Sequence, residues 1–202
     1  MKSNNKRTRP ASTIRSKLEV VLHENETCAS AVSETSLQQV LKRLQRAKRI
    51  FVLGEGRSGL VVRMFAMRLM HVGKQVFVAG DTTTPPIQEG DWIVALSASG
   101  ETPVTCLLAK GAAKNRGNLI AITATEDSTL SKAAGCTLII PAPSKRDFER
   151  KGSPNEKSAS VQFAGSLFEQ QALLIFDSLS LALAEAAHLD PATMWKRHAN
   201  LE

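Results

Sequence analysis

The chain has 202 residues, of which 43% are hydrophobic and 22% are charged. These values are typical of a soluble protein with one substantial core, and the length is too short for two full α/β domains. The formal net charge of +7 suggests nucleic-acid binding, but residues 1–17 hold six basic residues and no acidic one, which leaves +1 for the rest. The body of the protein is therefore close to neutral, and we expect no nucleic-acid partner.

The N-terminal segment, residues 1–13, is expected to be a basic flexible arm that precedes a single domain over residues 14–202. It contains arginine and serine and lacks acidic residues, as transit peptides do, but it has no clear apolar face. No apolar secretory segment follows it. The most apolar long stretch, residues 172–189, contains Asp177 and Glu185, so we expect no membrane span.

The three cysteines, Cys28, Cys106 and Cys136, are odd in number and share no spacing typical of a zinc site. They are interpreted as reduced, buried thiols of a cytoplasmic protein. The sequence therefore predicts neither a disulfide nor a metal site.

In chain order, apolar residues at helical spacing predict the helices and short apolar runs predict the strands. Two helices, one starting at Ile14 and one around residues 37–44, precede the first strand. Short apolar runs predict five strands at residues 50–53, 75–79, 92–96, 119–123 and 137–140. Helices are predicted at residues 58–71, 103–115 and 128–134, and a Thr/Pro loop at 81–86. This order is typical of an α/β fold with a doubly wound, five-stranded parallel sheet.

The C-terminal part begins with residues 142–160, which are highly charged, include Pro143, Gly152 and Pro154, and predict a surface loop. A long helix follows over residues 167–187 and is apolar on nearly all sides. Such a helix must be covered by more than its own sheet, and a subunit interface is the simplest explanation. A short helix at 191–198 ends the predicted elements.

Hydroxyl side chains gather where the third strand ends. Ser97, Ser99 and Thr102 surround Gly100, and a helix follows directly. The first N–H groups of a helix lack internal partners and, with the helix dipole and nearby hydroxyls, favour a phosphate. The same residue types are also common in ordinary caps and turns. This loop alone therefore leaves both interpretations open.

Residues 54–59, after the first strand, match the pattern G-x-G-x-x-G, and Asp81 lies 22 residues beyond Gly59. This pattern suggests a dinucleotide site. However, Glu55 would place a negative charge beside a pyrophosphate, and the third strand carries a hydroxyl loop that a dinucleotide fold does not need. Two neighbouring loops, one of them with Ser58, favour a small phosphate ester in the crevice between them.

The two loops and the segments around them resemble the SIS (sugar isomerase) domain, and within it the 6-phospho-3-hexuloisomerase family. The segments that carry the resemblance are residues 54–59, 65–71, 83–85, 97–102, 165–170 and 197–202. The resemblance covers the chain from about residue 15 onward. It implies a flavodoxin-like fold and the interconversion of 6-phospho-3-hexulose and fructose 6-phosphate, in the ribulose monophosphate route of formaldehyde fixation. It also implies that no cofactor is needed and that a homotetramer forms active sites from neighbouring subunits.

The chain departs from the family pattern in three places. Glu55 stands where the family has a small residue, Ala98 where glycine is usual, and Phe163-Ala164 where the family has Pro-Met. The last departure comes just before the helix that carries the expected catalytic carboxylate.

Moving a carbonyl between C3 and C2 of a sugar phosphate requires a base that takes the C2 proton and returns it at C3 through an enediolate. Glu169 is the candidate that the family motif marks. The spacing Ser166-x-x-Glu169 equally fits a capping box, in which Glu169 bonds back to the cap at Ser166. The two roles compete, because a helix N-terminus lowers the pKa of a carboxylate whereas a base at neutral pH needs it raised.

Two histidines and one arginine complete the expected site. The resemblance implies that His71 acts in ring opening or polarises the sugar and that His198 reaches an active site across a subunit boundary. From the residues alone, His71 is a histidine favoured by a helix C-terminus and His198 a surface residue. Arg57 is expected to pair with the phosphate or a sugar hydroxyl. The phosphate itself is expected to bind Ser58, Ser97, Ser99 and Thr102.

Two alternatives remain. One is a non-catalytic sugar-phosphate sensor with the same pocket, although the 49 residues before the first strand show no convincing helix-turn-helix. The other is an isomerase of another sugar phosphate, such as arabinose 5-phosphate.

Overall fold

The computed structural model describes residues 13–144, 160–163 and 165–198. Residues 1–12 of the predicted basic arm, most of the predicted loop at 142–160, Ala164 and the last four residues lie outside the described residues. Thr13, which we assigned to the arm, is the N-cap of the first helix and accepts a hydrogen bond from the backbone of Ser16.

The described residues form a five-stranded parallel sheet in the order β2-β1-β3-β4-β5. The strands are β1 (Arg49–Gly54), β2 (Gln75–Val78), β3 (Trp92–Leu96), β4 (Asn118–Thr123) and β5 (Cys136–Ile139). All five predicted strands are confirmed, with ends that differ by at most one residue. Such shifts are expected where strands fray at their ends.

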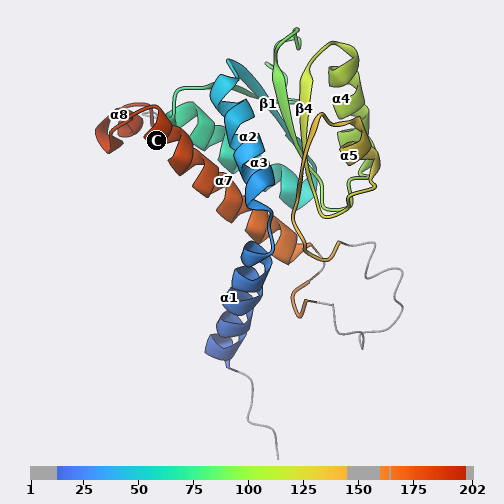
Figure 1. Cartoon of the computed structure of the whole chain (residues 1–202), viewed down its shortest axis with the longest axis vertical. Helices are drawn as coiled ribbons and strands as arrows, with labels where there is room; N and C mark the ends of the chain where they lie inside the picture. The colour runs from blue at the N-terminus through green and yellow to red at the C-terminus, as the bar shows by residue number, and fades with distance from the viewer. Residues whose placement is uncertain (1–12, 145–159, 164, 199–202) are drawn as a thin grey trace, which may run out of the picture.

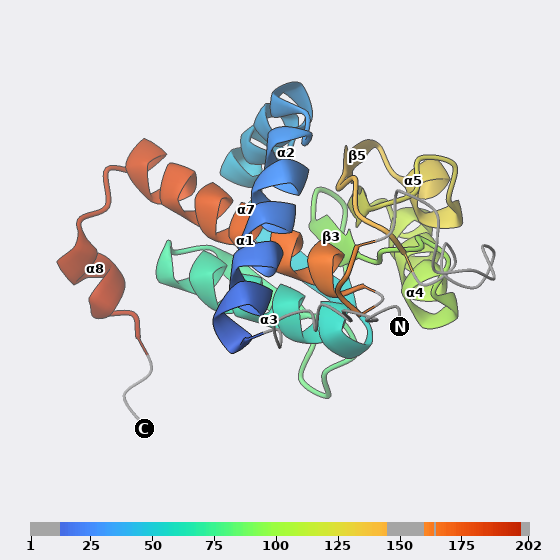
Figure 2. The same ribbon diagram turned by 90° about the horizontal axis from the view of Figure 1, so that it is seen from below.

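Helices cover both faces of the sheet, as Figures 1 and 2 show. The described helices are α1 (Ile14–Ser30), α2 (Glu34–Arg46), α3 (Gly56–His71), α4 (Pro103–Lys114), α5 (Thr129–Ala133), α7 (Ser166–Ala186) and α8 (Pro191–Trp195). On one face α2, α3 and α7 enclose the larger hydrophobic core, and on the other α4 and α5 enclose a smaller one. Helix α1 crosses α7 and extends away from the sheet.

The connection from β2 to β3 departs from strict alternation. Residues 79–91, all of them described, form turns and loop rather than a helix. Because β1 lies between β2 and β3, this connection carries the chain past β1. The predicted Thr/Pro loop at 81–86 is part of it.

The predicted helix at 191–198 is shorter than expected, since α8 ends at Trp195.

Helix α7 packs along α3 in the centre of the larger core, where the rings of Phe65 and Phe176 stack with centroids 4.1 Å apart. By length and composition α7 could cross a membrane, but 56% of its apolar window is buried in the fold, as in the core helix of a soluble protein. Leu174 and Leu181 of α7 remain more than half exposed. These two leucines are the exposed large apolar side chains of the helix that the sequence predicted to need a further partner.

Candidate active site

The sheet order defines a crevice between β1 and β3. The chain proceeds from β1 to β2 in one direction and from β3 to β4 in the other, so the topology reverses between these neighbours. Helix α3 leaves β1 toward one face and α4 leaves β3 toward the other. In open parallel sheets this switch point, at the carboxyl ends of the strands, is where ligands bind.

A cavity of about 280 Å³ lies elsewhere, between α2 and α7. The cavity at the switch point has a volume of about 120 Å³, and five of its eight lining residues have polar side chains. The residues that line the switch-point cavity are Glu55, Ser58, Leu96, Ser97, Ala98, Ser99, Thr102 and Gly165. The structure thus brings together all four hydroxyl residues that the sequence singled out for phosphate. Ser97 is buried, and its Oγ lies 3.0 Å from Thr102 Oγ1.

Three helix N-termini meet at this cavity. The N-caps of α3, α4 and α7 are Glu55, Thr102 and Gly165, and all three line it. Neither Glu55 nor Thr102 makes a capping hydrogen bond with its side chain, and Gly165 has no side chain that could make one. The N-caps of the other described helices each make one: Thr13, Ser33, Ser128 and Asp190. The helices with uncapped N-termini are therefore those that point at the cavity, where their N–H groups and dipoles favour an anion.

The loop after β3 has a glycine in the left-handed conformation at its centre. Gly100 has φ +62°, a left-handed conformation that favours glycine, and its N–H donates to Ser97 O at 3.0 Å. A methyl group on Gly100 would lie 2.1 Å from Ser128 Oγ. The backbone of this loop therefore lies directly against the segment before α5.

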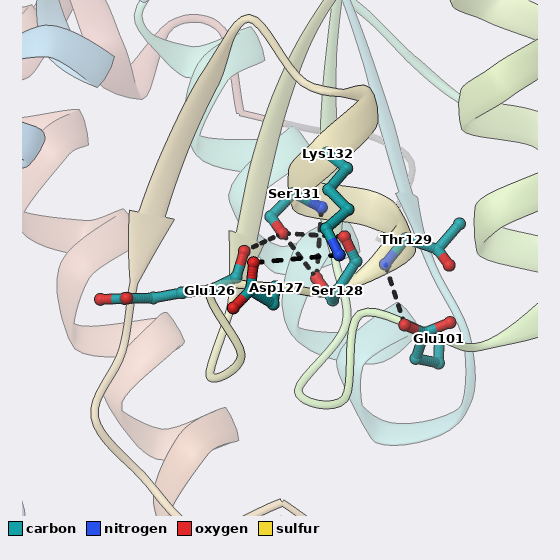
Figure 3. A network of polar contacts seen from close by, with 7 residues as sticks. All are labelled: Glu101, Glu126, Asp127, Ser128, Thr129, Ser131 and Lys132. Atoms are coloured by element: carbon teal, nitrogen blue, oxygen red, sulfur yellow. Dashed lines mark hydrogen bonds and ion pairs between the residues drawn. The ribbon is translucent and has the colours of Figure 1, made fainter.

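Glu101 attaches the same loop to α5, as Figure 3 shows. Its carboxylate accepts a hydrogen bond of 2.9 Å from the backbone N–H of Thr129, the first residue of α5. Leu130 N–H donates to Gly100 O at 3.0 Å. Glu101 is thus directed at α5, and the sequence did not reveal this, because an acidic residue near a helix start is ordinarily assigned to its own helix.

Glu169 lies beside the cavity and faces Arg57. The alternative of a capping box centred on Ser166 is wrong, because the N-cap of α7 is Gly165, with φ +86°, and Ser166 is already inside the helix. The Glu169 carboxylate accepts a hydrogen bond from Arg57 Nε, in the first turn of α3. The Glu169 side chain is 13% exposed and that of Arg57 is 64% exposed. A methyl group on Gly165 would lie 3.5 Å from Glu169 Oε1, which places the carboxylate next to the cavity wall.

The two histidines lie together at the other end of α3. His71, the last residue of α3, is buried, and its ring stacks on that of His198 with centroids 5.2 Å apart. Burial lowers the pKa of His71, and the neighbouring His198 and Arg68 lower it further. Sixteen helical residues span about 24 Å, so a single chain does not bring these histidines to Glu169. The ring of Trp195 also stacks on that of His198, with centroids 5.2 Å apart.

Comparison with known proteins defines the class. The model of the SIS domain matches residues 43–165, which contain β1 to β5 and both loops of the cavity. Together with the sheet order and the cavity at the switch point, this match establishes that the chain belongs to the SIS domain family. The resemblance noted in the sequence is thereby confirmed.

The relatives within this family are more specific. The 3-hexulose-6-phosphate isomerase of Mycobacterium gastri is 39% identical over 189 residues, which cover 94% of this chain and 92% of the relative. The protein of the same name from Bacillus subtilis is 38% identical over 186 residues and covers 90% of this chain and 95% of the relative. A crystal structure from Methanococcus jannaschii, from which a function of 3-hexulose-6-phosphate isomerase was inferred, is 30% identical with a TM-score of 0.76. It covers 92% of this chain and 99% of its own.

Proposed function

We propose that this protein is a 3-hexulose-6-phosphate isomerase, which interconverts 6-phospho-3-hexulose and fructose 6-phosphate. The observation that carries the proposal is the cavity in which three uncapped helix N-termini and four hydroxyl residues meet beside the Glu169 carboxylate. An anion of one phosphate group fits this environment without a metal ion, since N–H dipoles and hydroxyls supply the donors. The names of the relatives support the choice of sugar.

In the proposed reaction, Ser58, Ser97, Ser99 and Thr102 hold the phosphate. The anchored phosphate presents C2 and C3 of the open-chain sugar to Glu169. Glu169 removes the C2 proton, the electron pair forms the C2–C3 double bond of an enediolate, and the C3 oxygen takes the negative charge. Glu169 then returns the proton to C3, while a proton moves from the C2 hydroxyl to the C3 oxygen. The carbonyl ends at C2, and atoms and electrons balance with no cofactor.

Arg57 has two roles in this scheme. In the free site its guanidinium holds the carboxylate of Glu169. The side chain is largely exposed, so its remaining N–H groups are accessible to the phosphate or to sugar hydroxyls.

We further propose that His71 and His198 serve the site of a neighbouring subunit in a homotetramer located in the cytoplasm. Within one chain they lie a helix length away from Glu169, and a second copy would supply them. Exposed apolar side chains on the surface of α3 and α7 support such self-association: Leu60, Met64, Met67, Leu174 and Leu181. No nucleic acid or membrane enters this proposal.

The test is Glu169→Gln, assayed by following fructose 6-phosphate formation from a panel of ketose phosphates. We expect kcat to fall about 10²- to 10⁴-fold, because the general base is lost, while fructose 6-phosphate still binds. Glu185→Gln, at an exposed position of the same helix, is the matched control and should behave as wild type. Binding without turnover by the unaltered protein would instead identify a sensor, and turnover of arabinose 5-phosphate alone would identify a different isomerase.

A further inference from the structure

Helix α1 contacts the segment that precedes α7. The Glu24 carboxylate accepts three hydrogen bonds there: from Ser160 Oγ at 2.6 Å, from Val161 N–H at 2.8 Å and from Gln162 Nε2 at 2.9 Å. Three donors on one carboxylate define its position closely. The segment 160–162 is thereby attached to α1.

The next residue of α1, Asn25, contacts the two residues that follow Glu169 in the chain. Asn25 Nδ2 donates to Gln170 Oε1 at 2.6 Å and to Val21 O at 2.8 Å. Gln171 Nε2, which is fully buried, donates to Asn25 O at 2.7 Å and to Asn25 Oδ1 at 2.8 Å. The Asn25 amide thus uses both of its N–H groups and its oxygen, so its orientation is fixed.

Backbone hydrogen bonds connect these two contacts to Glu169 itself. Ser166 N–H donates to Phe163 O at 2.9 Å, and Glu169 N–H donates to Gly165 O at 3.0 Å. Gln162 lies seven residues before Glu169, and Gln170 directly follows it. The turn that presents the Glu169 carboxylate is therefore held from both sides by two consecutive residues of α1.

We propose that Glu24 and Asn25 are positioning residues, which set the placement of the Glu169 carboxylate relative to the phosphate cavity. This inference rests on the proposed function, in which Glu169 moves the proton. Neither residue lines the cavity, so their effect falls on turnover rather than on binding of the phosphate. Proton transfer depends steeply on distance and angle, and a displacement of about 1 Å costs on the order of a hundredfold in rate.

The charge of Glu24 matters as well as its shape. Burial alone would raise the pKa of Glu24, but the hydrogen bonds from Ser160, Val161 and Gln162, with the nearby His23, outweigh burial and lower it. The ionised form is therefore the one that the site stabilises. A glutamine at this position has the same shape but only one acceptor oxygen, and its amide N–H groups would face the donors of the segment 160–162.

The experiment compares kcat and KM for the isomerisation in wild type, Glu24→Gln and Asn25→Asp. We expect Glu24→Gln to lower kcat about tenfold to a hundredfold, with KM changed by less than about threefold. Asn25→Asp, which loses the donation to Gln170, should lower kcat in the same direction. Glu26→Gln is the matched control: Glu26 is exposed on the same helix and has no hydrogen-bond or ion-pair partner among the described residues, so it should behave as wild type.

Thermal unfolding and the binding of fructose 6-phosphate are measured on the same samples. The proposal is wrong if both variants keep kcat within twofold of wild type, if only KM changes, or if lost activity merely follows lost folded protein. Glu169→Gln, assayed in parallel, separates this inference from the proposed function. If Glu169→Gln retains wild-type turnover, the assignment of the base fails, whereas inactive Glu169→Gln with unaffected Glu24→Gln overturns only the positioning role.

Discussion

The two ends of helix α3 differ in chemistry. At its N-terminal end lie the hydroxyl residues of the cavity, the uncapped N–H groups and the pair of Arg57 with Glu169. At its C-terminal end lie His71, stacked on His198, and Arg197, whose Nη1 donates to His71 O at 3.0 Å. The helix dipole favours anions at the first end and cations at the second. A single chain therefore separates the hydroxyl residues and Glu169 from the two histidines by the length of α3.

The backbone after α3 allows Arg197 to approach the C-terminal end of the helix closely. Gly73, which follows α3, has φ +90°, and a methyl group there would lie 2.7 Å from Arg197 Nη1. Glycine thus permits both the turn and the approach of the guanidinium to the last carbonyls of the helix. Figure 2 shows α8 at the far end of α7, away from the start of α3. The two ends of α3 can act together only if a second copy joins them. The first of the following predictions tests this directly, and three more test the chemistry of each end separately.

The first prediction, with the largest expected effect, disables one end of α3 in one subunit and the other end in another subunit. Glu169→Gln and His198→Ala should each lower kcat about 10²-fold or more, because each removes a group that transfers or stabilises a proton. If the two ends meet across a subunit boundary, co-expression of the two variants restores roughly a quarter of the sites by random assembly. Kinetics on the purified mixed oligomer measure this. Activity no higher than that of either variant alone would rule out the shared site.

The second prediction concerns the rigidity of the cavity end. Gly100→Ala should lower the free energy of unfolding by about 2–4 kcal/mol, because the new methyl group meets Ser128 Oγ in a left-handed backbone conformation. Gly111→Ala, in the interior of α4, is the control: its methyl group would meet no atom of the described residues within 4 Å. That substitution should raise stability by up to about 1 kcal/mol. Urea denaturation measures both, and equal stabilities would contradict the close packing of this loop.

The third prediction concerns charge at the cavity. Glu55 is exposed at the N-cap of α3 and lines the cavity, where it opposes a phosphate dianion. Glu55→Gln should therefore lower the dissociation constant for fructose 6-phosphate about twofold to fivefold, and the gain should shrink as salt is added. Calorimetric titration at two ionic strengths measures this. The control Glu89→Gln, before the amino end of β3, should leave the dissociation constant unchanged. Weaker binding by Glu55→Gln would contradict the prediction and mean that Glu55 itself contacts the sugar.

The smallest effect concerns the histidine end. The folded-state pKa of His71 lies below its ordinary value of 6.5, so the unfolded chain binds the proton more readily. The contribution of His71 to the free energy of unfolding is therefore fully present above pH 6.5. It is lost as the pH falls through that value toward the folded pKa. Urea denaturation at pH 7.5 and 5.5 should show a smaller loss for His71→Gln than for wild type. The control His188→Asn, at an exposed position, should lose as much stability between pH 7.5 and 5.5 as wild type. If His71→Gln also loses as much as wild type, the pH dependence of stability comes from other groups.

Much of the fold could be predicted from the sequence, because its signals are local. Apolar runs predicted the five strands, and glycine and hydroxyl residues predicted the loops after residues 53 and 96. The strand ends of a parallel sheet meet at one edge, so local patterns sufficed to bring Ser58 and Ser97 together. The capping box at Ser166 was wrong for a local reason too, since glycine at 165 adopts the left-handed conformation and begins the helix one residue earlier.

Contacts between distant residues were decided only by the tertiary structure. Arg57 and Glu169 are 112 residues apart, and Asn25 and Gln170 are 145 residues apart. Nothing in the spacing of such residues specifies a hydrogen bond, because their distance depends on how α1, α3 and α7 pack on the sheet. The sequence alone determined which edge of the sheet would gather hydroxyl residues and helix N-termini, because both signals are local. Packing of whole helices decided that Glu169 faces Arg57 beside that edge and that His71 and His198 lie at the opposite end.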